Sequence, residues 1–223
     1  ISVRIDSRVF VVTASVARLG KPIPLPEVWP EEVRAWLKPT REVDFENEGF
    51  APIIESIKKR SHNLSDVVTN CVAECGSIRK SNNQRAAPPT RTCMASATLR
   101  SNGFCTSAAN QLAALLRGCG VPARIIAGYP TWAHRPFSMH FIVEYYAPQS
   151  GWSPIESTWL DAEWPSYGHI YGTIVSPAFE ESSKRRGYVS DGVPQNSGFE
   201  FSDFSLISNY TGTLHPNGSD HLC

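Results

Sequence analysis

The chain has 223 residues, of which 41% are hydrophobic and 19% are charged. This is enough for one globular domain with a sizeable core. The 21 basic residues balance the 21 acidic ones, so the composition offers no electrostatic footprint for nucleic acid or an anionic membrane. No uninterrupted apolar run approaches the ~20 residues that cross a bilayer. The chain begins with Ile1 rather than Met, which indicates a processed or trimmed chain and leaves its compartment open.

Residues 1–30 are expected to form a lead-in with little regular structure. The apolar run at residues 9–12 predicts one short strand, and four prolines follow between residues 22 and 30, which favours irregular chain. Such a lead-in is compatible with the remnant of an upstream β domain.

Three helices are predicted after the lead-in. The first spans about residues 31–37, and the second spans about 51–59, where Pro52 suits the first turn. The third has apolar residues at three- and four-residue spacing from Leu64 to Ile78, which is typical of one buried helical stripe.

Two cysteines, Cys71 and Cys75, lie one turn apart on this stripe. They amount to half of a metal site, but Cys93 and Cys119 do not complete a recognisable zinc spacing. Two small buried residues are therefore the preferred interpretation.

A polar loop is expected over residues 81–92, followed by a strong helix that begins at or near Cys105 and ends at Gly118 and Gly120. Three strands are then predicted at 124–129, 140–146 and 152–158. The last two flank a turn-like segment, 147–151, and are expected to pair as a hairpin. A core over residues 31–186 would precede a tail, residues 187–223, that is rich in Gly, Ser, Asn and Asp.

Cys105 is a candidate nucleophile because of its position in the chain. It follows the turn-forming residues 101–104 and opens an amphipathic helix. A thiol at a helix N-terminus lies beside unpaired backbone N–H groups and the positive end of the helix dipole. Both features stabilise the thiolate, which is the reactive form, and the N–H of Cys105 would point toward an oxyanion formed there.

His140 and Glu156 are the candidate partners of that thiol. If the hairpin turn centres on Pro148, His140 faces Glu156 directly, and the two side chains project from the same face with Cβ atoms ~5 Å apart. A carboxylate there would hold the imidazole tautomer and stabilise the imidazolium. A one-residue slip would put the two residues on opposite faces.

Several segments of the chain resemble the transglutaminase-like superfamily in order, spacing and element type. The resemblance covers about residues 64 to 160, and the segments that carry it are Gly103-Phe104-Cys105, Leu115 to Arg124, Ala127-Gly128-Tyr129, His140 to Tyr145 and Gly151 to Thr158. It implies an α+β, papain-like fold with helices packed on an antiparallel sheet and the nucleophile at a helix N-terminus.

The resemblance also implies a triad of cysteine, histidine and aspartate. Cys105 and His140 match the first two positions, but Glu156 stands where the family usually has Asp. The extra methylene of the glutamate must be absorbed by backbone position or rotamer, and Asp161 is the alternative. A second oxyanion donor is also needed, for which Asn102 is a guess.

The implied reaction is attack of the Cys105 thiolate on an amide carbonyl, with a thioester intermediate. The leading interpretation is a cysteine peptidase or amidase acting on a peptide-like substrate. The alternatives are a transglutaminase-type acyltransferase with an amine co-substrate and a non-catalytic binding module of the same fold.

The expected partners are therefore peptides or proteins, with no nucleic acid and no membrane. We infer no metal and no cofactor, because His134 and His169 have no carboxylate or cysteine at metal spacing and are interpreted as surface or structural residues. The aromatic residues near the candidate site are interpreted as substrate walls or core, with Trp132 as a candidate substrate contact.

Overall fold

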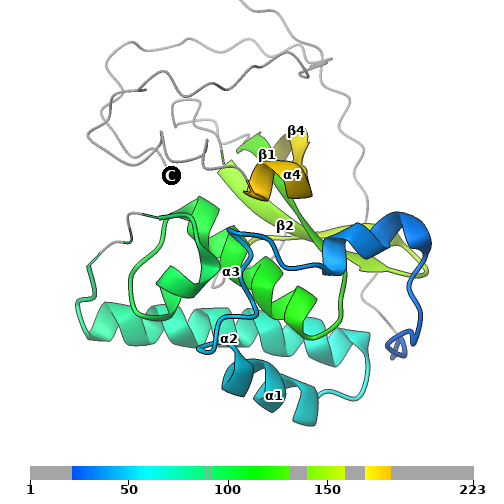
Figure 1. The fold of residues 1–223 in the computed structure, drawn as a ribbon, viewed down its shortest axis with the longest axis horizontal. Helices are drawn as coiled ribbons and strands as arrows, with labels where there is room; N and C mark the ends of the chain where they lie inside the picture. The colour runs from blue at the N-terminus through cyan, green and yellow to red at the C-terminus, as the bar shows by residue number, and fades with distance from the viewer. Residues whose placement is uncertain (1–21, 89, 91, 131–139, 159–168, 182–223) are drawn as a thin grey trace, which may run out of the picture.

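The computed structural model describes residues 22–88, 90, 92–130, 140–158 and 169–181 (Figure 1). The strand predicted at residues 9–12 and the tail predicted at 187–223 lie outside these residues. The division into a lead-in, a core and a tail stays a prediction.

The helices predicted from the sequence are present in the structure. In chain order, the helical elements are η1 (Glu31–Leu37), α1 (Ala51–Lys59), α2 (Leu64–Gln84), η2 (Ala95–Leu99), α3 (Cys105–Gly118) and α4 (Pro177–Glu181). The first of them, η1, is a 3-10 helix. The sequence analysis did not predict η2 or α4.

α2 begins with a side-chain cap and extends further than its apolar stripe. The side chain of Asn63 accepts a hydrogen bond from the backbone N–H of Asp66 at 3.0 Å, which satisfies a donor in the first turn. The helix continues into the segment expected to be a polar loop because buried Asn82 donates from Nδ2 to the carbonyls of Thr98 and Ser101. A tertiary contact therefore sets this helix end.

α3 is the central helix, and every residue from Cys105 to Arg117 is buried. It ends where the sequence predicted, with Gly120 at a φ of +86°. The N–H of Gly120 donates to Arg117 and the N–H of Val121 donates to Leu116, both at 2.9 Å. These are the two hydrogen bonds of a Schellman motif, which favours glycine at the left-handed position.

The four strands form one antiparallel sheet in the order β3-β2-β1-β4. The strands are β1 (Ala123–Pro130), β2 (His140–Ala147), β3 (Gly151–Ile155) and β4 (His169–Val175). The first three were predicted, although β3 ends three residues earlier than expected. The edge strand β4 was not predicted.

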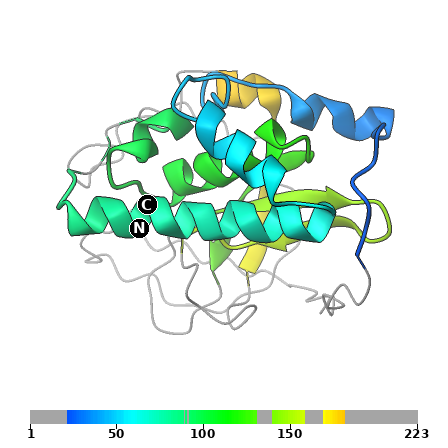
Figure 2. The same ribbon diagram turned by 90° about the horizontal axis from the view of Figure 1, so that it is seen from below.

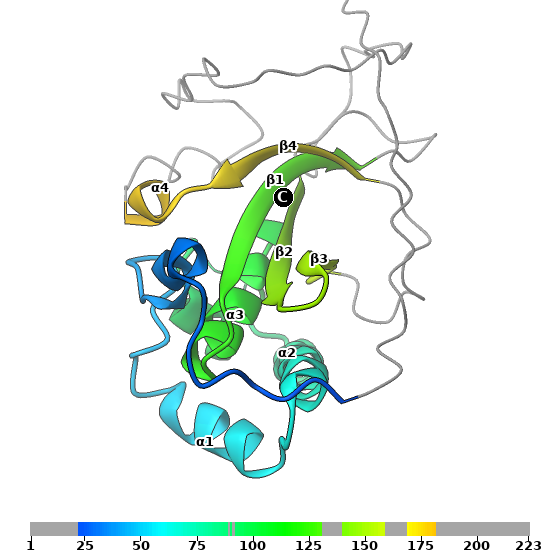
Figure 3. The ribbon, with the colours of Figure 1, turned by 90° about the vertical axis from the view of Figure 1, so that its right-hand side faces the viewer.

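The elements stack in layers. α3 packs against β1 and β2, α2 packs against α3, and α1 packs against α2, as the side view shows (Figure 3). Seen from below, α2 runs across the helical side of the molecule (Figure 2). The α+β fold class, with helices packed on an antiparallel sheet and Cys105 at the start of a helix, is confirmed.

Residues 22–30 lie against this core. The carbonyl of Ile23 accepts from the N–H of Leu64 at 2.8 Å, and the indole N–H of Trp29 donates to the carbonyl of Gly120 at 2.8 Å. Both side chains are buried. Within the described part of the chain, no helix is long and apolar enough to span a membrane.

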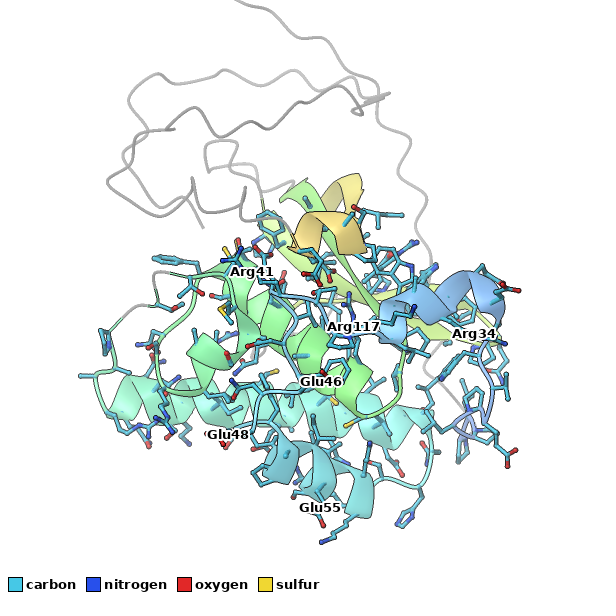
Figure 4. The ribbon with its side chains drawn as sticks, in the orientation of Figure 1. Arg34, Arg41, Glu46, Glu48, Glu55 and Arg117 are labelled. Carbon is cyan, nitrogen blue, oxygen red and sulfur yellow. The ribbon has the colours of Figure 1, made fainter. Side chains whose placement is uncertain are left out.

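A buried ion pair joins α3 to α4. Arg117 and Glu180 form two parallel hydrogen bonds of 2.8 Å, and both side chains are fully buried. Thr40 donates its hydroxyl to the same carboxylate at 2.8 Å, and Arg117 also donates to the carbonyl of Ala123. Figure 4 shows Arg117 in the interior beside the ribbon of α3, whereas Glu55 lies on the outside of α1.

Replacement of Glu180 by alanine should destabilise the protein strongly, because the guanidinium of Arg117 would stay buried without its carboxylate. We expect Glu180→Ala to lower the free energy of unfolding in urea by about 3–5 kcal/mol. The matched control is Glu181→Ala, at an exposed neighbour, which should change it by no more than about 0.5 kcal/mol. Equal small losses from both variants would contradict this role.

Candidate active site

Cys105 is the first residue of α3 and is fully buried. Phe104 precedes it in an extended conformation as the N-cap residue and makes no side-chain cap hydrogen bond. The thiol therefore lies at the positive end of the helix dipole.

His140 is the first residue of β2, where it pairs with Gly128 of β1, and it is 3% exposed. Its Nε2 lies 2.9 Å from Oε2 and 3.1 Å from Oε1 of Glu156. Glu156 is also buried, at 6% exposure. The structure therefore brings together the histidine and the glutamate that the sequence analysis selected.

The predicted register of the hairpin is wrong, although the two side chains still meet. Ala147 pairs with Gly151 and Val143 pairs with Ile155, so the turn centres on Gln149 rather than on Pro148. The cause is Gly151, whose φ of +73° lets it serve as the partner of Ala147.

This two-residue slip keeps both side chains on one face of the hairpin. One step past the last pair, Glu156 would lie opposite Ile142, which shares a face with His140. His140 and Glu156 are therefore diagonal neighbours, for which Cα atoms are typically about 7–8 Å apart. The extra methylene of a glutamate suits this longer reach.

Backbone groups hold the carboxylate of Glu156 in place. The N–H of Thr158 donates to Oε1 of Glu156 at 2.6 Å. From α2, the guanidinium of Arg79 donates to the carbonyls of Ser157 and Thr158. The sequence analysis missed Arg79, but a signal existed, because Arg79 continues the one-turn spacing of Cys71 and Cys75 along a buried stripe.

The packing of α3 against β2 positions Cys105 relative to His140 and Glu156. α3, which begins at Cys105, packs against β2, which begins at His140. The catalytic roles of Cys105, His140 and Glu156 stay a proposal.

Asn102, the guessed oxyanion donor, holds a neighbouring loop. Its Nδ2 donates to the carbonyl of Ala87 at 3.0 Å, and its backbone carbonyl accepts from Thr90 at 2.6 Å. Its role as an oxyanion donor stays a prediction. Asp161, Trp132 and His134 lie outside the described residues, and of His169 only the backbone in β4 is described.

The cysteines of α2 are buried, as the sequence analysis preferred. Cys71 and Cys75 are at most 1% exposed, and burial raises the pKa of the Cys75 thiol to about 12. A hydrogen bond with Cys119, together with burial, raises the pKa of Cys71. Among the described residues, no group of three or more His, Cys, Asp or Glu side chains is arranged to hold a metal ion.

Comparison with known proteins relates these residues to one family. Residues 54–157 match the model described as the transglutaminase-like superfamily. A segment of 67 residues is 36% identical to a protein-glutamine gamma-glutamyltransferase of Pseudomonas aeruginosa and covers 26% of this chain and 10% of that protein. The chain thus spans about a tenth of the length of this curated relative.

Two solved structures are similar at low identity. A proposed cysteine protease from Cytophaga hutchinsonii is 20% identical with a TM-score of 0.49, over 66% of this chain and 49% of that one. The periplasmic domain of TgpA from Pseudomonas aeruginosa is 19% identical with a TM-score of 0.36, over 62% of this chain and 46% of that one.

The buried thiols of α2 should be inert in the folded protein. At pH 8, Cys75 is protonated because its pKa is about 12, so it should resist iodoacetamide while a small model thiol reacts. Peptide mass spectrometry after timed labelling measures this, and labelling in urea provides the control in which the free cysteines of the described residues all react. Native labelling of Cys75 at the rate of the model thiol would contradict its raised pKa.

Substitution of Glu156 should slow alkylation of Cys105 if the carboxylate supports His140. We expect Glu156→Gln and Glu156→Asp each to lower the rate of Cys105 alkylation at pH 7 by about 10-fold or more. The glutamine removes the negative charge, and the shorter aspartate side chain does not extend as far as Nε2 of His140. Glu144→Gln is the matched control, because Glu144 lies on β2, the strand that begins at His140, but pairs with Arg124 at 2.7 Å. Equal rates in Glu156→Gln and Glu144→Gln would exclude the coupling.

Proposed function

We propose that the chain, whose residues 54–157 belong to the transglutaminase-like superfamily, is a thiol enzyme that acts on amide bonds through a thioester. Cys105 is the nucleophile, His140 transfers the proton, and Glu156 orients and stabilises the imidazole. The observation that carries this proposal is the contact of His140 Nε2 with both carboxylate oxygens of Glu156 in a buried hairpin.

The contact with Glu156 determines how the imidazole is used. An ionised carboxylate only accepts hydrogen bonds, so Nε2 of His140 is the nitrogen that carries a proton. In the neutral ring, Nδ1 is then the nitrogen with a lone pair, and it is the atom that takes a proton from a thiol. The negative charge of Glu156 stabilises the imidazolium that results.

The reaction follows from these roles. The thiolate of Cys105 attacks the amide carbon, and the backbone N–H of Cys105 at the start of α3 stabilises the oxyanion. The imidazolium of His140 donates its proton to the leaving amine, which leaves a thioester on Cys105. A second nucleophile then attacks the thioester and regenerates the thiol.

Hydrolysis of a peptide-like substrate, with water as that second nucleophile, is the function we favour. Transfer to an amine is the second candidate, and one observation favours it. The curated relative that is 36% identical over 67 residues is named as a protein-glutamine gamma-glutamyltransferase. Both candidates share the same acylation step.

A non-catalytic binding module is the alternative of another class. Glu156, which stands where the family usually has aspartate, is the sequence feature that favours it. In the structure, that glutamate contacts the histidine from a diagonal position that suits its length, which supports an enzyme rather than a decayed site.

Removal of the proposed nucleophile tests catalysis. We expect Cys105→Ala to abolish turnover of a fluorogenic peptide amide, and His140→Ala to lower kcat by about 10²–10⁴-fold. Cys93→Ala is the matched control at a half-buried cysteine and should retain activity. Unchanged turnover in Cys105→Ala would refute the proposal.

A labelled amine separates hydrolysis from transfer. The protein is incubated with a glutamine-containing peptide and a fluorescent primary amine, and the products are resolved by mass spectrometry. Hydrolysis predicts the free acid without the label. Incorporation of the amine, absent in Cys105→Ala, would replace hydrolysis by acyl transfer as the assigned reaction.

A further inference from the structure

Arg79 links the helical layer to the segment that follows β3. It lies near the C-terminal end of α2, one turn beyond buried Cys75, and is half-buried. Its Nη2 donates to the carbonyl of Ser157 and its Nη1 donates to the carbonyl of Thr158. One guanidinium therefore binds two successive peptide groups.

These two peptide groups directly adjoin the candidate carboxylate. β3 ends at Ile155, so Glu156 lies just beyond the last residue pair of the hairpin ladder. Ser157 is 1% exposed, and the N–H of Thr158 donates to Oε1 of Glu156 at 2.6 Å. The carboxylate is therefore oriented by a backbone segment that Arg79 holds.

The contacts form a continuous path from α2 to the imidazole. Arg79 binds the carbonyls of residues 157 and 158, Thr158 binds Glu156, and Glu156 contacts Nε2 of His140 at 2.9 Å. No step of this path needs contact between Arg79 and the substrate.

We propose that Arg79 is a positioning residue of the active site, which fixes the backbone at residues 157 and 158 so that Glu156 stays in contact with His140. This rests on the proposed function of Cys105, His140 and Glu156. The geometry of the arginine matters, because a planar fork of N–H donors reaches two neighbouring acceptors at once. A lysine ammonium is a point charge on a flexible stem and holds one orientation of that segment less well.

The test compares Arg79→Gln and Arg79→Lys with Lys80→Gln. Lys80 is the next residue of α2 and is exposed, so its substitution removes the same charge without the two hydrogen bonds. We expect Arg79→Gln to lower both kcat and the rate of Cys105 alkylation at pH 7 by about 10- to 100-fold. Arg79→Lys should recover part of this loss, and Lys80→Gln should match the unmodified protein.

A double variant separates positioning from a general loss of structure. If Arg79 acts through Glu156, then Arg79→Gln should change the alkylation rate of Cys105 little further in a protein that already carries Glu156→Gln. Equal fold losses in both backgrounds would overturn the inference. Urea unfolding of each variant verifies that the protein is folded at the assay temperature, and Arg79→Lys, which keeps the charge, replaces Arg79→Gln if the latter unfolds.

The same measurements distinguish this inference from the proposed function. If alkylation of Cys105 is insensitive to both His140→Ala and Glu156→Gln, the proposed triad itself fails. If alkylation depends on Glu156 but Arg79→Gln behaves like Lys80→Gln, the triad stands and the role of Arg79 is wrong.

Discussion

The contact between His140 and Glu156 is the constraint on which the rest of the site depends. An imidazole and a carboxylate are both removed from water here, and burial of such groups is unfavourable unless each has a partner. The hairpin register places His140 and Glu156 in contact, and the N–H of Thr158 donates to Glu156. Arg79 in turn donates to the carbonyl of Thr158. The length of the glutamate, the early end of β3 and the position of Arg79 on α2 are therefore parts of one arrangement rather than separate features.

A buried ion pair stabilises another region of the same framework. Arg117 and Glu180 join the end of α3 to α4, and Thr40 attaches the segment after η1 to the same carboxylate. α3 thus has the candidate nucleophile at its first residue and a buried arginine near its last. Because α3 packs against both central strands, the pair at one end of the helix and the packing along its length together fix where Cys105 lies relative to the sheet.

Local periodicity and end signals predicted most of the helices and the strands β1, β2 and β3. The apolar stripe from Leu64 to Ile78 located α2, and the glycines after residue 117 located the end of α3, since both signals are local. The predicted hairpin register was wrong because the observed register depends on the left-handed conformation of Gly151. The sequence permits this conformation but does not require it. Arg79 was missed because its partners are backbone carbonyls 78 and 79 residues away. Its one-turn spacing after Cys75 places it on the stripe of α2 but does not identify those partners. β4 was missed because its short apolar segment carries no signal of the strand that it pairs with.

The central claim is that the thiol of Cys105 becomes acylated with the help of His140 and Glu156. Trapping of the intermediate tests this most directly. The protein is mixed with an activated p-nitrophenyl ester, quenched in acid and digested, and the acylated peptide is identified by mass spectrometry. The account predicts that the acyl group is on Cys105, that it is absent in Cys105→Ala and that it accumulates more slowly in His140→Ala and Glu156→Gln. Acylation of another residue, or equal acylation rates in these variants and the unmodified protein, would contradict it.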